Sequence, residues 1–249
     1  MKIPSNDHST VLHALFPTLV YQASLDEPQQ YGEAFAERRK ESAFRPGVRG
    51  SARYNAGEYH GEILLHHVPE LRPFFGALSA EVTKYLRVLG MKPEFFEMQC
   101  LKSWFVLCEP EPDTDESMVA HNHSCSDISW VYYLDVPDAS SPIKFHAGTR
   151  LKTEPFGSAF HYDWHNDHKS AVSTINWWNS DNWSVHPKEG DLLLFPGHQL
   201  HSVEANQSDK PRVSVAGDIA LTLKEEFKDL EFGRTSQKHW LTLPLSDES

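Results

Sequence analysis

Three histidines in the second half of the chain have the types and spacing of a metal site. His121 and His123 occur in MVAHNHS, two positions apart, so on a β-strand their side chains leave the same face. His201 follows GDLLLFPGHQL, where two turns enclose a short apolar strand, and it begins a further strand that faces back toward the first pair. Imidazole nitrogens suit divalent first-row metals, including iron. The pattern therefore predicts one metal ion bound by His121, His123 and His201.

An arginine follows the third histidine in the next predicted strand. Arg212 occurs in RVS, where alternation places Arg212 and Ser214 on the same face. An arginine stays charged, so inside a β-barrel it needs an anion as a partner. Its planar guanidinium matches the two oxygens of a carboxylate. Arg212 therefore indicates a carboxylate ligand in the same interior as the metal.

The elements that must position these residues are short strands. From Phe95 onward, segments rich in aromatic and β-branched residues alternate with clusters of Pro, Gly, Asp and Ser. Such strands without intervening helices predict a mainly β fold, with a jelly roll rather than a parallel α/β sheet as its core. The predicted strands are FFEMQCLKSWFVL, MVAHNH, DISWVYYLDV, PIKFHA, TINWW, GDLLLFP, HSVEAN and VSVAGDIALT.

Helices are expected to flank this core on its N-terminal side. LFPTLVYQASL predicts a strand, a helix follows from Pro28 to about Ser42, and a loop follows over 45–57. Apolar residues at three- and four-residue steps predict a second helix over 71–89. We expect the whole chain, 1–249, to form one domain, which divides into an N-terminal helical support (1–94), a jelly-roll core (95–223) and a docked C-terminal tail (224–249).

A polar, aromatic and histidine-rich insertion is expected within the core, over residues 150–187. A long irregular segment in a compact domain is often a functional loop, so we expect a lid over the metal. Its HYDWHNDH segment offers an alternative set of metal ligands, His161 with Asp163 and His165 with Asp167, although a solvated loop is the simpler interpretation. Its tryptophans are expected to cover one end of the barrel: Trp177, Trp178 and Trp183.

The order of these motifs resembles a known family. HxH, SWVYYL, GDLLLFP, a histidine and RxS follow one another as in the 2-oxoglutarate–Fe(II) oxygenases of bacteria and phages, and LFPTLVY and the segment around Trp104 are also similar to that family. The resemblance spans about residues 14 to 222. It implies a double-stranded β-helix, a jelly roll of the cupin type, with Fe(II) as cofactor and 2-oxoglutarate and O₂ as co-substrates.

The resemblance also implies roles for single residues. His121 and His201 match metal positions, Arg212 matches the residue that pairs with the distal carboxylate of 2-oxoglutarate, and Ser214 assists it. The chain departs from the commonest triad of the family, HxD or HxE with a distal histidine, because His123 stands where the carboxylate would be. Either three histidines bind the iron, or His123 lies behind the ligands and water completes the site.

The function implied is a 2-oxoglutarate-dependent dioxygenase that hydroxylates a small molecule, an amino acid or a peptide side chain and releases succinate and CO₂. The alternative is a cupin-type dioxygenase or isomerase, because HxH with Asp127, followed by the glycine, proline and histidine of GDLLLFPGHQLH, nearly reproduces the two cupin motifs. A cupin would have no need for Arg212. A third possibility is a binding module without catalysis, against which the metal site and the arginine argue.

The composition of the chain indicates which binding partners and which cellular compartment to expect. Asp and Glu outnumber Lys and Arg by 35 to 23, which disfavours a nucleic-acid partner. No apolar run approaches the roughly 20 residues that span a bilayer, and the first residues lack the pattern of an export signal. The three cysteines form no CxxC pair, so we expect reduced thiols and a cytoplasmic location. The sequence does not specify an oligomeric state.

Overall fold

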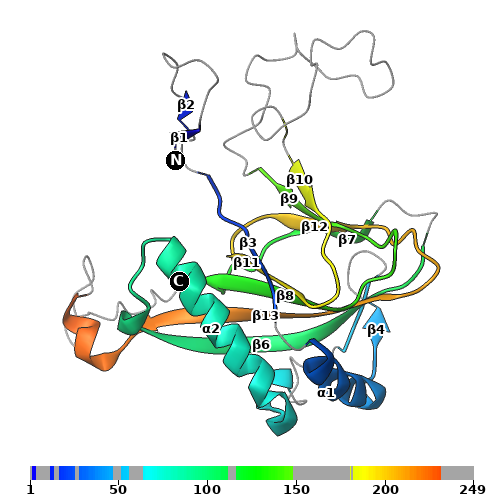
Figure 1. Cartoon of the computed structure of the whole chain (residues 1–249), viewed down its shortest axis with the longest axis horizontal. Coiled ribbons are helices and arrows are strands. Elements are labelled where there is room, and N and C mark those ends of the chain that lie inside the picture. Colours follow the sequence, from blue (N-terminus) through cyan, green and yellow to red (C-terminus); the bar gives the residue numbers. More distant parts are fainter. Residues whose placement is uncertain are drawn as a thin grey trace, which may run out of the picture.

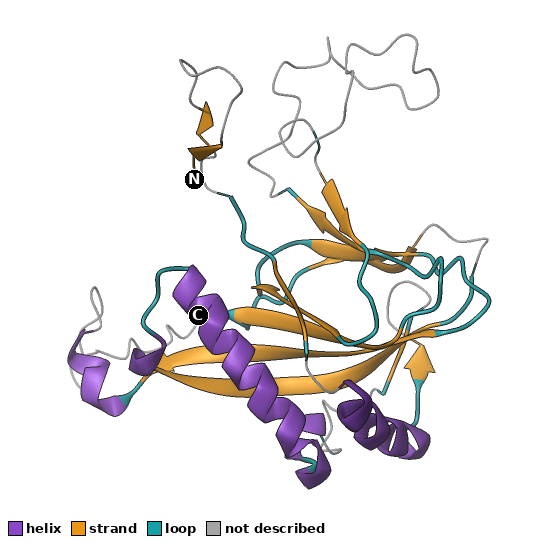
Figure 2. Cartoon of the chain, viewed as in Figure 1, coloured by secondary structure: helices purple, strands orange, loops and turns teal. Residues whose placement is uncertain are grey.

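Two antiparallel sheets face each other and form the core of the molecule (Figure 1). This computed structural model describes residues 2–3, 12–13, 17–25, 28–46, 52–55, 64–111, 116–147, 180 and 182–230. Strands dominate, and the helices lie outside the sheets (Figure 2). Among the described residues, no helix is long and apolar enough to span a membrane.

The large sheet has seven strands in the order β3-β11-β8-β13-β6-β5-β4. Its centre is the pairing of β13 with the long strand β6 on one side and with β8 on the other. The strands are β3 (Tyr21–Ser24), β4 (Arg45–Pro46), β5 (Arg53–Tyr54), β6 (Phe96–Cys108), β8 (Ile128–Asp135), β11 (Asp191–Pro196) and β13 (Arg212–Leu223).

The small sheet has four strands in the order β10-β9-β12-β7. Its strands are β7 (Glu116–His121), β9 (Ile143–His146), β10 (Asn182–Val185) and β12 (His201–Glu204). A separate pair joins β1 (Lys2–Ile3) and β2 (Leu12–His13). The 3₁₀ helices are η2 (Leu65–His67), η3 (Pro69–Leu71), η4 (Pro93–Phe95) and η7 (Glu225–Leu230).

The long helix α2 (Arg72–Val88) covers the face of the large sheet that points away from the small sheet (Figure 1). Its apolar stripe, which includes Phe74 and Tyr85, packs in one cluster with Trp130 of β8 and Leu192 of β11. The shorter helix α1 (Pro28–Glu41) adds Phe35 to this cluster. The helices therefore close one side of the sheet and leave the other side for the site.

Strand β11 is buried on both faces, which explains its continuous apolar run. Leu192 and Leu194 face the helices, whereas Leu193 and Phe195 pack between the two sheets. Each of these side chains is fully buried, and burial of one such side chain contributes roughly 1.5–3 kcal/mol. This strand thereby anchors the turn that leads to His201.

The predicted fold class, mainly β with flanking helices around a jelly roll, is confirmed. The prediction of a loop over 45–57 was wrong in part, because β4 and β5 extend the edge of the large sheet there. The strand β10 was not predicted; it lies in the insertion over 150–187 and pairs with β9. The division of the chain at residues 94 and 223 stays a prediction.

Several sequence predictions fall outside the described residues. These are the strand TINWW, most of the insertion with its alternative ligands His161, Asp163, His165 and Asp167, the side chains of Trp177 and Trp178, and the C-terminal tail beyond 230. Trp183 is described and lies on β10 with 48% of its surface exposed. The three cysteines are free thiols, as predicted.

Candidate metal centre and co-substrate site

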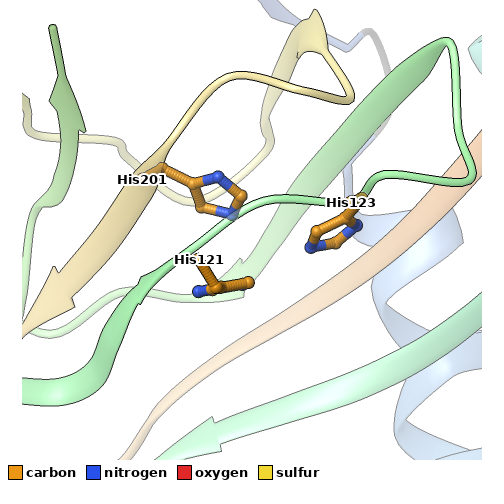
Figure 3. Close-up of side chains that lie close together, drawn as sticks. All are labelled: His121, His123 and His201. Carbon is orange, nitrogen blue, oxygen red and sulfur yellow. The ribbon is translucent and has the colours of Figure 1, made fainter. Parts of the chain in front are cut away.

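The three predicted histidines meet between the sheets (Figure 3). Strands β7 and β12 run antiparallel with His121 directly opposite His201, and the two ring centroids lie 4.3 Å apart. The ring of His123 lies 5.3 Å from that of His121 and 5.4 Å from that of His201. One ring nitrogen from each histidine lies within 4.8 Å of the other two, which is close enough for all three to bind a single ion.

His123 reaches this cluster from a turn, because β7 ends at His121. The expectation that one strand face carries both residues was therefore wrong for His123. Its backbone N–H donates to the carbonyl of Gly197 at 2.8 Å, and the Gly197 N–H donates to the carbonyl of Asp127 at 3.0 Å. A Cβ atom at Gly197 would collide with the backbone oxygen of Ser126. A glycine is thus required where the turn after β11 meets the turn after β7.

Hydrogen bonds fix which nitrogen of each ring carries the proton. The partner of His121 Nδ1 is the carbonyl of Val119 at 2.8 Å, and that of His201 Nδ1 is the carbonyl of Gln199 at 2.9 Å. The partner of His123 Nδ1 is Oδ1 of Asp218 at 2.6 Å. Carbonyl and carboxylate oxygens only accept, so each Nδ1 donates its proton and each Nε2 keeps a free lone pair.

Burial favours the neutral form of two of the rings. Burial, together with the neighbouring His121, lowers the pKa of His201 to about 3. Burial also lowers the pKa of His121. Burial raises the pKa of Asp218, but hydrogen bonds from His123, Lys102 and Ser129 outweigh it and bring the value down to about 2. The rings of His121 and His201 are therefore in the neutral form that metal binding requires, and the carboxylate of Asp218 nearby is ionised.

Arg212 is a buried cation at the start of β13, with 2% of its surface exposed. Its Nη1 donates to the carbonyl of Ser141 at 2.7 Å, its Nη2 to Sγ of Cys108 at 3.5 Å, and its guanidinium lies 5.4 Å from the ring centroid of Tyr133. Its Nε has no hydrogen-bond partner. Within the described part of the chain, no carboxylate lies within 4.0 Å of this guanidinium. A buried cation without a counter-ion is costly, so an anionic ligand fits here.

One cavity of about 590 Å³ joins the histidines to Arg212 and Ser214. Its volume lies in the range of small-molecule sites. Its walls carry apolar and aromatic side chains such as Tyr54 and Trp104, and the charged side chains among its described lining residues are Lys102 and Arg212. All five residues predicted from the sequence thus border the same space.

The structure corrects the interpretation of one acidic residue and adds three residues that the sequence analysis did not name. Asp127, the acidic residue of the cupin interpretation, points elsewhere, since its Oδ2 accepts the Leu221 N–H at 2.7 Å. Asp218 was missed, although alternation from Arg212 along β13 places both on the same face. Lys102 and Ser129 were missed with it, because they are its neighbours only through strand pairing.

Comparison with known families agrees with this site. Residues 102–218, which include the three histidines, Arg212 and Ser214, match the family described as "Putative 2OG-Fe(II) oxygenase". This segment is a 2OG-Fe(II) oxygenase domain. This segment thus contains β7 to β12, the part of β6 from Lys102 onward, and the part of β13 that carries Arg212 and Asp218. No curated protein sequence matches the chain.

Solved structures share the fold of the oxygenase domain at low sequence identity. The non-heme alpha ketoglutarate dependent epimerase SnoN from nogalamycin biosynthesis matches with a TM-score of 0.52 and 18% identity, over 93% of this chain and 92% of that one. A prolyl-4-hydroxylase from Pseudomonas putida matches with a TM-score of 0.50 and 14% identity, over 82% of this chain and 92% of that one. These similarities confirm the double-stranded β-helix.

Proposed function

We propose that His121, His123 and His201 bind the iron of this oxygenase domain, and that Arg212 and Ser214 bind 2-oxoglutarate. The observation that carries the proposal is the shared cavity. Three histidines with free Nε2 lone pairs lie at one part of it, and a buried arginine with no carboxylate partner among the described residues lies at another. A dicarboxylate such as 2-oxoglutarate has one carboxylate for the metal and a second for Arg212.

The residues have distinct tasks in this proposal. The histidines hold the metal through neutral nitrogens, and their second nitrogens are already committed to Val119, Gln199 and Asp218. Arg212 pairs with the distal carboxylate and so fixes the direction in which the co-substrate lies. When bound, iron and 2-oxoglutarate supply the oxidation, in which O₂ is consumed and succinate and CO₂ are released.

Ser214 is placed to assist Arg212. It follows Arg212 by two positions on β13, is 1% exposed, and lines the same cavity. Its hydroxyl can donate to a carboxylate oxygen that the guanidinium leaves open. The apolar side chains nearby exclude water, which strengthens both contacts.

The cavity also supports a class of substrate. Tyr54, Trp104, Met118 and Val131 line its walls, and no acidic side chain is among the described residues that border it. A cationic substrate would therefore find no carboxylate partner among the described residues that border the cavity, so we infer a neutral or anionic substrate with an apolar body. Within the classes of small molecule, amino acid and peptide side chain, this disfavours lysine and arginine side chains.

Hydroxylation of a C–H bond is the outcome that we propose. The fold alone allows others, since the SnoN epimerase has been solved in complex with Fe³⁺, alpha ketoglutarate and nogalamycin RO, with a TM-score of 0.53 at 16% identity. A related carbocyclase, SnoK, has a TM-score of 0.52 at 15% identity. In this proposal the position of the substrate in the cavity, and not the barrel, decides the reaction outcome.

The decisive experiment measures succinate formed from 2-oxoglutarate by the purified protein with Fe(II) and O₂. We expect slow turnover without substrate, loss of turnover in His201→Ala, and a raised requirement for 2-oxoglutarate in Arg212→Lys. Iron binding with no consumption of 2-oxoglutarate under any condition would instead support the cupin alternative.

A further inference from the structure

Asp218 lies behind the proposed metal ligands and is completely buried on β13. It stands directly between Lys102 of β6 and Ser129 of β8 in the two strand pairings. Its Oδ1 accepts hydrogen bonds from His123 Nδ1 at 2.6 Å and from Ser129 Oγ at 2.8 Å, and its Oδ2 lies 2.9 Å from Lys102 Nζ. Strand register thus holds this carboxylate from both sides.

His123 depends on this carboxylate in a way that the other two histidines do not. His121 and His201 each donate Nδ1–H to a carbonyl two residues earlier in their own segment. His123 lies past the end of β7, and in the described part of the chain its ring is hydrogen-bonded to Asp218 instead. Asp218 therefore decides which nitrogen of His123 carries the proton.

We propose that Asp218 is a positioning residue of the metal centre: it keeps the proton of His123 on Nδ1, leaves Nε2 free to bind iron, and places a negative charge one imidazole ring away from the metal. The inference rests on the proposed function. A carboxylate behind a metal-binding histidine fixes the ring and raises its basicity. In the commonest triad of the family, a carboxylate ligand stands where His123 does. Asp218 supplies the negative charge of such a ligand from behind the ring of His123 instead of by direct contact with the metal.

Lys102 makes the proposal testable, because it controls how an amide would lie at this position. In Asp218→Asn, the amide oxygen should turn toward the Lys102 ammonium, since an NH₂ group cannot accept from a cation. The NH₂ group then faces His123 Nδ1 and forces the proton onto Nε2, where it blocks the metal. Removal of the cation in Lys102→Met, Asp218→Asn lets the amide oxygen turn back and accept from Nδ1.

The first experiment is a titration of Co(II) into the metal-free proteins, followed by visible absorption. We expect Asp218→Asn to weaken binding about 10- to 100-fold, and the double variant to recover at least half of that loss on a logarithmic scale. Lys102→Met alone should bind at least as tightly as the wild type. Wild-type affinity in Asp218→Asn would overturn the inference, as would an equal loss in the single and double variants.

The second experiment detects the proton itself by nitrogen NMR of the histidine rings in metal-free protein at about pH 8, above the ordinary histidine pKa. His123 should be protonated on Nδ1 in the wild type, on Nε2 in Asp218→Asn, and again on Nδ1 in the double variant. A proton on Nδ1 in all three proteins would overturn the inference even if metal binding fell.

A matched control comes from Asp191, another buried aspartate. It accepts hydrogen bonds from Ser24 Oγ, Gln22 Nε2 and the Lys188 N–H, and no histidine is among its hydrogen-bond partners in the described part of the chain. Asp191→Asn should lower the melting temperature without changing Co(II) affinity. Failure of the wild type to bind metal would remove the proposed function itself, whereas wild-type binding with no effect of Asp218→Asn would remove the positioning role alone.

Discussion

Replacement of Arg212 by methionine should separate co-substrate binding from metal binding. Methionine keeps much of the volume of the arginine chain but removes the guanidinium, which has no carboxylate partner among the described residues. The proposed metal ligands all lie outside β13, so their geometry should be preserved. We expect Arg212→Met to bind metal as the wild type does and to lose most of its affinity for 2-oxoglutarate.

The expected loss of affinity follows from the burial of Arg212, where its contact with the distal carboxylate of 2-oxoglutarate would form. A charge-assisted, two-point contact in a site that is 2% exposed contributes about 2–4 kcal/mol, or roughly 30- to 900-fold in dissociation constant. At a concentration 100 times the wild-type dissociation constant, a ligand stabilises the folded protein by about 2.7 kcal/mol. A 100-fold loss of affinity in Arg212→Met would reduce this stabilisation to about 0.4 kcal/mol by the same relation.

The assay is thermal unfolding with Mn(II), without O₂, at increasing 2-oxoglutarate concentrations. The control is Arg53→Met, because Arg53 is 44% exposed and its contact with Glu109, at 3.6 Å, lies at the surface. The control should retain the full ligand-induced rise in melting temperature, and Arg212→Met should show little of it. An equal rise in Arg212→Met and the wild type would refute the assignment of Arg212 to 2-oxoglutarate.

The other predictions concern the metal ligands, the turn at Gly197 and the stability at low pH. His121→Ala and His201→Ala should each lower Fe(II) affinity by more than about 100-fold, and full metal occupancy in either variant by elemental analysis would exclude that ligand. Gly197→Ala should destabilise the fold by about 1–3 kcal/mol and weaken metal binding, because the new Cβ overlaps Ser126, whereas Gly76→Ala, with open space around it in α2, should be neutral or stabilising in urea unfolding. Burial lowers the pKa of His66 to about 4, so the unfolded chain binds more protons than the folded one from about pH 6.5 down to 4, and stability falls over that window. His66→Gln should reduce the loss of unfolding free energy over this pH window by about 1–2 kcal/mol after allowance for solvent screening. Identical pH profiles of stability for the variant and the wild type would contradict the lowered pKa of His66.

The sequence predicted those features that depend on the spacing of apolar residues, or on a charged residue, within one segment. Alternating apolar residues and turn residues predicted the strands of the core, and three- and four-residue steps predicted α2. The strands β4 and β5 could not be predicted in this way, because each has two residues and exists only through pairing with a neighbour. Arg212 stood out as a charge in an apolar strand, and Asp218 in the same strand carried the same signal with the opposite sign.

The three histidines differ in how far the sequence determines their role. For His121 and His201, the acceptor that fixes the ring is a carbonyl two residues earlier, so the local backbone conformation sets both the direction of the ring and the position of its proton. For His123, the acceptor is Asp218, and the backbone anchor is Gly197. Both contacts require the finished barrel. This difference explains why the sequence left open whether His123 binds the metal. The ring of His123, which we propose as a ligand, is fixed by the anionic side chain of Asp218 on β13, a contact that the sequence around His123 does not reveal.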